Sequence, residues 1–379
     1  MSNRSIFEEL GEGAAPKQAP AGGMIDAGRG GARLAIRAWL IVLGALVLLM
    51  IMVGGLTRLT DSGLSITEWA PVTGAIPPLN AADWASEFEK YRQIPEYQLQ
   101  NAGMSLAEFK VIYWWEWGHR QLGRVIGLVW AVGFLWFLLR KQIPTGWTPK
   151  LLLLGALGGL QGAIGWWMVS SGLTGTMLDV ASYRLATHLG LAFVIIGLIA
   201  WFSFQLSRPD RELMQARRDR EASLATLGTL LAAGVFLQIL IGALVAGIDA
   251  GRAYNDWPLM SGEVFPSNAF DLQPTWRNFF ENSGLVQFIH RTWGYVVFGF
   301  AIYVGIRAGK SPHKLTRKAY GRVGLLIVLQ VVIGIVTVLL MAPLWIAIIH
   351  QVLAAILWVA ILHARFLSGY PRQTSLREA

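Results

Sequence analysis

The chain has no cysteine among its 379 residues, and charged side chains make up only 15% of it. The absence of cysteine excludes disulfides, thiolate zinc sites and cysteine-ligated iron–sulfur clusters within this chain. Electrons for any redox chemistry must therefore come from another protein or a small molecule. The first twenty residues lack an apolar core and contain Glu8, Glu9 and Glu12, so they resemble neither a signal peptide nor a transit peptide. We expect a disordered cytoplasmic tail there.

Hydrophobic residues, in contrast, make up 54% of the chain and occur in long uninterrupted runs. A helix of about 20 apolar residues crosses the hydrocarbon core of a bilayer, which is about 30 Å thick. We therefore predict an all-α polytopic membrane protein. Its eight transmembrane helices are expected near residues 35–53, 119–139, 151–169, 185–206, 224–247, 288–306, 321–341 and 345–364.

Basic residues predict the orientation, because cytoplasmic segments retain Lys and Arg during insertion. They gather in the N-terminal tail, in the segment 207–223 and between residues 307 and 322. With eight spans, both termini are then cytoplasmic. This topology, together with anionic lipid head groups, accounts for the net charge of +9, so we expect no nucleic-acid binding.

The sequence repeats itself, with four spans in each half. The matched residues are Gly54, Asp61 and Trp69 with Gly242, Asp249 and Trp257; His119 and Gly123 with His290 and Gly294; Gln161 and Gly165 with Gln330 and Gly334; and His188 with His350. Four spans per repeat give both halves the same orientation, so we predict two tandem four-helix bundles related by a pseudo-two-fold axis along the membrane normal. The expected divisions are a cytoplasmic tail, the N-terminal half, a cytoplasmic linker, the C-terminal half and a second cytoplasmic tail, at residues 1–34, 35–206, 207–223, 224–366 and 367–379.

Four histidines lie near the starts of the even-numbered spans, at equivalent repeat positions: His119, His188, His290 and His350. Those spans run inward, so all four are expected at the outer end of the bundle. One such histidine could be a packing residue, but four matched ones favour ligands. Neutral imidazoles from two facing helices suit the axial positions of haem iron, which predicts two bis-histidine haem sites. His313 and His363 lie in or beside basic cytoplasmic segments, lack repeat partners and are assigned no site.

Glycines along the predicted helices either leave space for a flat macrocycle or serve as ordinary packing positions between membrane helices. They are Gly127, Gly155, Gly158, Gly159 and Gly165.

The two halves differ one helical turn before the first histidine of each. Glu116 precedes His119 by three residues, whereas the equivalent residue before His290 is Gln287. A carboxylate there can orient the imidazole, accept a proton or stabilise positive charge, although it could also be an interfacial residue within a tryptophan belt. We therefore expect the chemistry in the N-terminal half, with Glu116, His119 and His188 as the catalytic set.

Arginines follow the first histidine of each half. Arg120 and Arg291 are expected to neutralise haem propionates in the two sites, or else to snorkel to the membrane interface.

Three segments carry a resemblance to the haem A synthases, which extends over residues 35–365. They are the outer-loop sequence GGLTRLTDSGLSITEWAPVTGAIPP (residues 54–78), the WWEWGHR motif (residues 114–120) and the repeated His290-Arg291. The chain is similar to the cysteine-free branch of alphaproteobacteria and mitochondria. The resemblance implies oxidation of a ring methyl of haem O to a formyl group, giving haem A for cytochrome c oxidase, in the bacterial inner membrane with the haem sites toward the periplasm.

The resemblance also implies roles for the histidines. His290 and His350 would ligate the iron of a resident haem b, while His119 and His188 would hold the substrate haem O beside Glu116. Four electrons must be removed, either with one axial ligand leaving during turnover or by oxidation at the macrocycle edge and addition of water. Implied partners are a haem O synthase and an external electron donor, and the bundle is compatible with homo-oligomers.

Other functions remain open on the residues alone. A di-haem b-type cytochrome would carry electrons through the membrane, but it needs haems near opposite faces. A transporter of parallel repeats needs polar groups near the midplane, and the spans offer few. A structural assembly factor would account for the outer loops without explaining the paired histidines.

Overall fold

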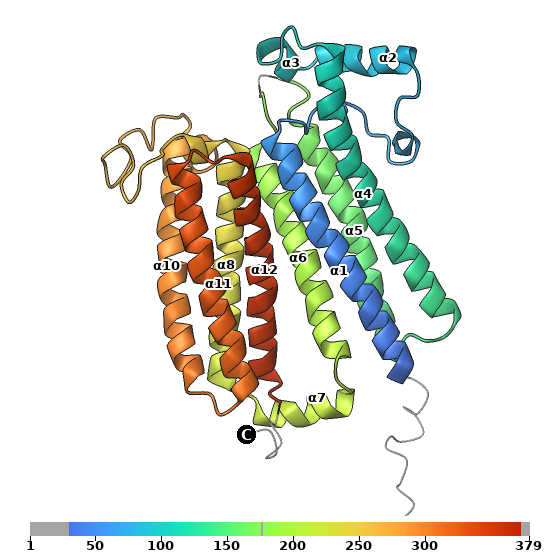
Figure 1. Ribbon diagram of the computed structural model, residues 1–379, viewed down its shortest axis with the longest axis vertical. Coiled ribbons are helices and arrows are strands. Elements are labelled where there is room, and N and C mark those ends of the chain that lie inside the picture. The colour runs from blue at the N-terminus through green and yellow to red at the C-terminus, as the bar shows by residue number, and fades with distance from the viewer. Residues whose placement is uncertain (1–29, 176, 373–379) are drawn as a thin grey trace, which may run out of the picture.

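The computed structural model describes residues 30–175 and 177–372, and within them it contains twelve α-helices and no strand (Figure 1). Seven of these helices are long and apolar enough to cross a membrane, which confirms a polytopic membrane protein. They are α1 (Gly30–Leu59), α4 (Leu106–Leu139), α5 (Thr148–Val169), α6 (Ser182–Leu206), α8 (Ala222–Gly247), α11 (Lys314–Leu339) and α12 (Leu344–Gly369).

The predicted sixth span lies within α10 (Ser283–Gly309), a helix of 27 residues. It is not among the seven, and its sequence is interrupted by Gln287, His290 and Arg291. α10 nevertheless runs the length of the bundle beside α8 and α11 (Figure 1). The predicted tails fall mostly on residues 1–29 and 373–379, which lie outside the described residues.

The long helices pack in two neighbouring groups, α1 with α4, α5 and α6, and α8 with α10, α11 and α12 (Figure 1). The groups meet where α6 packs on α8 and α12, and where α1 packs on α12. A single buried apolar core runs through both groups and includes Leu40, Phe193, Leu231 and Ile361, each at most 1% exposed. Apolar side chains on the outside of the bundle are suited to contact with lipid.

The segment 60–105 folds into a small helical layer at one end of the bundle, above α4 and α5 (Figure 1). It contains η1 (Thr73–Ala75), α2 (Ala81–Arg92) and α3 (Pro95–Leu99), and α2 starts at Asn80, whose side chain accepts a hydrogen bond from the Asp83 backbone. Its own core is aromatic, built around Tyr91 and Phe109, which are fully buried. The long first outer loop is therefore a structured layer.

The corresponding segment of the C-terminal half, residues 248–282, has shorter elements. They are η3 (Ala250–Arg252), η4 (Thr275–Arg277) and α9 (Asn278–Glu281). At the other end of the bundle, α7 (Asp210–Ala216) and η2 (Arg217–Asp219) lie in the predicted linker between the halves.

Helix α4 begins at Leu106, thirteen residues before the start predicted for the second span. Ser105 and Glu108 form a capping box that starts the helix there. The added turns carry Phe109 and Tyr113 into the aromatic core of the outer layer. A search for apolar runs stops at the edge of the membrane, whereas this helix continues beyond it to support a separate layer.

Candidate functional site

The four predicted histidines lie on α4, α6, α10 and α12. His188 and His350 are each the seventh residue of their helix, and His290 is the eighth. With a rise of about 1.5 Å per residue, these three lie about 10 Å from the helix start. His119 follows the extra turns of α4 that pack under the outer layer, so all four gather toward the same end of the bundle.

The histidines form two pairs. His119 and His188 lie within electrostatic range of one another, and so do His290 and His350. Within the part of the chain that the structure describes, no three residues among His, Cys, Asp and Glu come together as a metal cluster. Two imidazoles without a third ligand suit the two axial positions of a haem iron better than a tetrahedral zinc ion.

Each imidazole lies against a glycine on the preceding long helix, where an added Cβ would press on the ring. A Cβ at Gly54 would lie 3.1 Å from Nε2 of His119, and a Cβ at Gly165 would lie 2.9 Å from Cε1 of His188. A Cβ at Gly242 or Gly334 would lie 3.0 Å from Cε1 of His290 or His350. Four glycines therefore leave space for four imidazoles, which is the cradle that a bis-histidine haem requires.

Three of the histidines also contact a glutamine of their own, which lies one turn before the facing glycine on the same helix. Nε2 of Gln161 donates to the backbone oxygen of His188 at 2.9 Å and lies 3.3 Å from its Nδ1. Nε2 of Gln238 likewise donates to the backbone oxygen of His290 at 3.0 Å and lies 3.1 Å from its Nδ1. Nε2 of Gln330 donates to the backbone oxygen of His350 at 3.1 Å and lies 3.3 Å from its Nδ1.

The carbonyl oxygens of these three glutamines are buried and have no hydrogen-bond partner. An imidazole that binds iron through one nitrogen must donate the N–H of the other, and such an N–H is almost always accepted by an oxygen. The orphaned oxygens thus fit histidines that ligate iron.

The glutamine–glycine motif occurs three times, and a fourth copy has a methionine in place of the glutamine. The repeat alignment pairs Gln161 with Gln330 but does not by itself indicate a role for them. The motif is visible in the sequence as LQGAIG, LQILIG and LQVVIG at residues 160–165, 237–242 and 329–334, with LMIMVG at 49–54 as the fourth member. The copies are separated by unequal distances, so the two-fold comparison of halves does not reveal them together.

Glu116 lies one turn before His119, but its carboxylate is turned toward the outer layer. It is 2% exposed, and its Oε2 accepts hydrogen bonds of 2.7 Å from the hydroxyl of Ser65 and the backbone N–H of Ile66. Its Oε1 accepts from Arg120 at 2.6 Å. Within the described residues no hydrogen bond joins Glu116 to His119, so the carboxylate ties the loop of residues 62–66 to the turn that carries the histidine.

Gln287 occupies the same place in the other half and uses its amide in the same way. It is 1% exposed, donates to the backbone oxygen of Ala250 at 2.8 Å and accepts from Arg291 at 3.0 Å. Both halves therefore anchor an outer loop to the helix turn before a histidine, with a carboxylate in one half and a neutral amide in the other.

Arg120 and Arg291 also face the outer loops. Arg120 donates to the backbone oxygens of Ile66 and Glu68, and Arg291 donates to those of Tyr254, Asp256 and Leu259. Nε of Arg291 is buried without a partner. In the structure the guanidinium groups hold the two loops over the histidine pairs.

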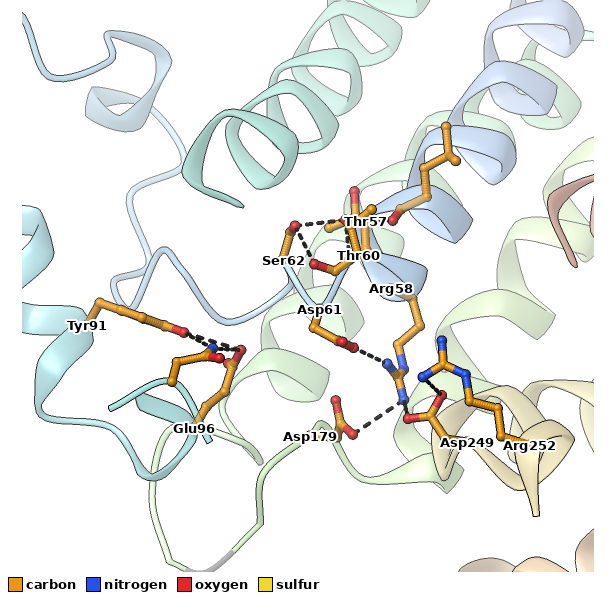
Figure 2. A network of polar contacts seen from close by, with 12 residues as sticks. Thr57, Arg58, Thr60, Asp61, Ser62, Tyr91, Glu96, Asp179, Asp249 and Arg252 are labelled. Atoms are coloured by element: carbon orange, nitrogen blue, oxygen red, sulfur yellow. Dashed lines mark hydrogen bonds and ion pairs between the residues drawn. The ribbon is translucent and has the colours of Figure 1, made fainter. Parts of the chain in front are cut away.

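The outer ends of the two halves are joined by an ion-pair network centred on Arg58, at the end of α1 (Figure 2). The Arg58 side chain is 13% exposed and pairs with three carboxylates, those of Asp61 at 2.9 Å, Asp179 at 3.3 Å and Asp249 at 2.8 Å. Asp249 also approaches Arg252 at 3.8 Å. Because Asp61 and Asp249 are repeat partners, one arginine connects equivalent positions of the two halves.

A buried carboxyl group lies beside this network in the outer layer (Figure 2). Glu96 is 3% exposed, lies 3.3 Å from the hydroxyl of Tyr91, and accepts from Asn101, also at 3.3 Å. Its second oxygen has no partner. Burial raises the pKa of Glu96 to about 8, with a further contribution from the negative charge of Asp179.

The predicted glycines divide into two kinds. Gly155 packs directly against the ring of Trp130 and Gly165 against His188, whereas Gly127, Gly158 and Gly159 have open space where a Cβ would point. Of the histidines assigned no site, His363 packs against the ring of Phe204, 5.0 Å away.

Comparison with known proteins gives a consistent result along the whole chain. Residues 37–362 match the family of cytochrome oxidase assembly proteins. Haem A synthases of three bacteria are similar over nearly all of both chains. The one from Ruegeria sp. strain TM1040 is 62% identical over 379 residues, covering 100% of each chain. That of Dinoroseobacter shibae is 63% identical over 378 residues, 99% of this chain and 98% of its own. That of Paracoccus denitrificans is 59% identical over 377 residues, 100% of this chain and 99% of its own.

Proposed function

Because the chain belongs to the family of cytochrome oxidase assembly proteins, we propose that it is a haem A synthase. It is an oxidoreductase that converts a methyl group of haem O to a formyl group, which supplies haem A to cytochrome c oxidase. The observation that carries this function is the pair of two-histidine cradles, each histidine with its own glycine, in a chain that aligns from end to end with haem A synthases.

We propose that the eight long helices form two tandem four-helix bundles related by a pseudo-two-fold axis along the membrane normal. The repeated contacts support this symmetry: Gly54 and Gly242 lie against His119 and His290, while Gly165 and Gly334 lie against His188 and His350. Helix α10 is the sixth membrane span in this arrangement. Its contacts with α8 and α11 support that assignment.

The C-terminal half is proposed to hold a resident haem b between His290 and His350, and the N-terminal half to hold the substrate haem between His119 and His188. A resident haem of this kind supplies one-electron transfer. The chain's own contribution there is to fix both imidazoles through Gln238 and Gln330. Substrate chemistry is assigned to the other half because only that half has a carboxylate beside its histidine.

Glu116 is the carboxylate that we propose gives the N-terminal half its substrate chemistry. Its four hydrogen bonds come from Ser65, Ile66 and Arg120, and these hold a negative charge at a fixed position one turn from His119. A fixed carboxylate stabilises positive charge that develops on the macrocycle. Arg120 and Arg291 hold the loops that exclude bulk water from the two pairs, and their guanidinium groups are also proposed to meet the haem propionates.

We further propose a bacterial inner-membrane location with both termini cytoplasmic and the histidine pairs toward the periplasm. The basic residues of α7, η2 and the α10–α11 connection support this orientation, because they lie at the end of the bundle opposite the outer layer (Figure 1). Proposed partners are a haem O synthase and an external electron donor.

The test is haem analysis in a host that makes haem O but lacks its own haem A synthase. The intact chain is expected to yield haem A. Glu116→Ala is expected to accumulate haem O or a hydroxylated intermediate while keeping the resident haem b. Haem B alone from both proteins would contradict the synthase function and favour a di-haem electron-transfer cytochrome.

A further inference from the structure

One of the four histidines is held differently from the other three. The rings of His188, His290 and His350 all present Cε1 to their glycine, at 2.9 to 3.0 Å from the position of a Cβ. His119 instead presents Nε2 to Gly54, at 3.1 Å. Its ring is therefore turned relative to the other three, although the glycine it faces is in the equivalent position.

The residue one turn before that glycine accounts for the difference. In the other three copies it is a glutamine whose amide contacts the imidazole and the backbone of the histidine. In the first copy it is Met50, whose thioether is at most a weak acceptor. Met50 occupies the place of Gln238 closely: Cε of Met50 lies 3.5 Å from a Cβ at Gly123, and Nε2 of Gln238 lies 3.3 Å from a Cβ at the equivalent Gly294.

No other group replaces the missing amide. Within the described residues the His119 ring takes part in no hydrogen bond, and the polar side chains one turn before it and next to it in the chain, Glu116 and Arg120, are bound to each other and to the outer loop. An imidazole whose second nitrogen has no partner is a weaker and less well oriented metal ligand. The deficiency is confined to one of the four positions.

We infer that Met50 makes His119 the labile axial ligand of the substrate haem, so that iron in the N-terminal half can lose this imidazole while the other three stay bound. This inference rests on the proposed function and adds to it. It favours the route in which one axial ligand leaves during turnover. Met50 acts here as a positioning residue, because it determines how firmly His119 is held.

Carbon monoxide is a direct probe, because it binds ferrous haem only where an axial position becomes free. Purified full-length protein, reduced with dithionite, is titrated with carbon monoxide and followed by absorption. In the intact chain one of the two haems is expected to react. Met50→Gln should lower the affinity of that haem for carbon monoxide on the order of five-fold, the effect of one net hydrogen bond. Met50→Leu, which also lacks an amide, is the matched control and should behave like the intact chain.

The reciprocal variant tests the same idea in the other half. Gln238→Met removes the amide from His290 and should allow carbon monoxide to react with the resident haem. This variant decides the matter if Met50→Gln does not fold. Unchanged reactivity in both glutamine–methionine exchanges, or no reaction in the intact chain, would overturn the inference. Haem chromatography of the same samples tests the proposed function separately, because formation of haem A does not depend on which ligand leaves.

Discussion

The two halves of this protein use the same framework with different chemistry at two positions. In both, an arginine after the first histidine holds an outer loop through backbone oxygens, and a glycine faces each imidazole. The halves differ at Glu116 and Gln287, one turn before the first histidine of each half, and at Met50 and Gln238, on the preceding long helices α1 and α8. In the proposed function the shared framework would hold a haem in each half, and the residues at the two differing positions would determine its reactivity.

The largest expected effect comes from removing a ligand in one half only. His290→Ala should lose the resident haem b from purified protein, because it deletes one of the two axial ligands, while His119→Ala should keep it. The measurement is the haem content per chain and the bis-histidine absorption bands of the reduced protein. Loss of the same haem in both variants would show that the halves do not bind haem independently.

Substituting Glu116 and Gln287 in turn should have unequal effects on haem A formation. Glu116→Gln should lower haem A formation about 100-fold or more, the effect of losing a charge-stabilising group. Gln287→Ala, which removes the amide of the other half without setting a carboxylate against the backbone oxygens of Ala250 and Tyr254, should lower haem A formation much less. Haem A and its intermediates are quantified by chromatography, with the resident haem b measured as a control for folding. Comparable losses from both substitutions would remove the reason for assigning chemistry to the N-terminal half.

Removing the Arg58 side chain, which joins the outer ends of the two halves, should lower the free energy of unfolding. Arg58→Ala leaves the carboxylates of Asp61, Asp179 and Asp249 close together without their cation. Because these carboxylates are partly exposed, we expect a loss of about 1–2 kcal/mol rather than the larger cost of a fully buried pair. Thermal unfolding in detergent measures the loss, and added salt should reduce it. A variant as stable as the intact chain would show that helix packing alone joins the halves.

The smallest expected effect is confined to the outer layer of the N-terminal half. The raised pKa of Glu96, about 8, means that the folded layer keeps a proton that the unfolded chain releases above its ordinary pKa of 4.5. The free energy of unfolding should therefore fall as pH rises from the unfolded to the folded pKa and then level off. Glu96→Gln, which stays neutral, should flatten this dependence.

Limited proteolysis of the segment 60–105 at about pH 5 and about pH 9 measures this effect, because linkage predicts faster cleavage of the intact chain at the higher pH. Glu89→Gln is the matched control, since Glu89 lies on α2 but is exposed. An equal pH dependence in the intact chain and in Glu96→Gln would contradict the role of this carboxyl.

The helical architecture could be predicted from the sequence, because a long apolar segment in a membrane satisfies its own backbone hydrogen bonds as a helix. All eight predicted spans coincide with long helices, and the paired histidines lie on them. The start of α4 at Leu106 did not follow, because its first turns are stabilised by an aromatic layer rather than by lipid. The partners of Glu116 and Arg120 did not follow either, since they come from a loop about 50 residues away whose path is set by tertiary packing.

Each imidazole lies against the long helix that immediately precedes its own in the chain, α4 on α1, α6 on α5, α10 on α8 and α12 on α11. Each histidine and its glycine therefore belong to one hairpin of two long helices, so a two-histidine cradle is assembled from two consecutive hairpins. Three of the four hairpins share Leu, Gln, Ile and Gly within the same six-residue segment. Met50 marks the one hairpin in which the glutamine is absent, so the four-fold pattern identifies the exceptional position more directly than the comparison of halves does.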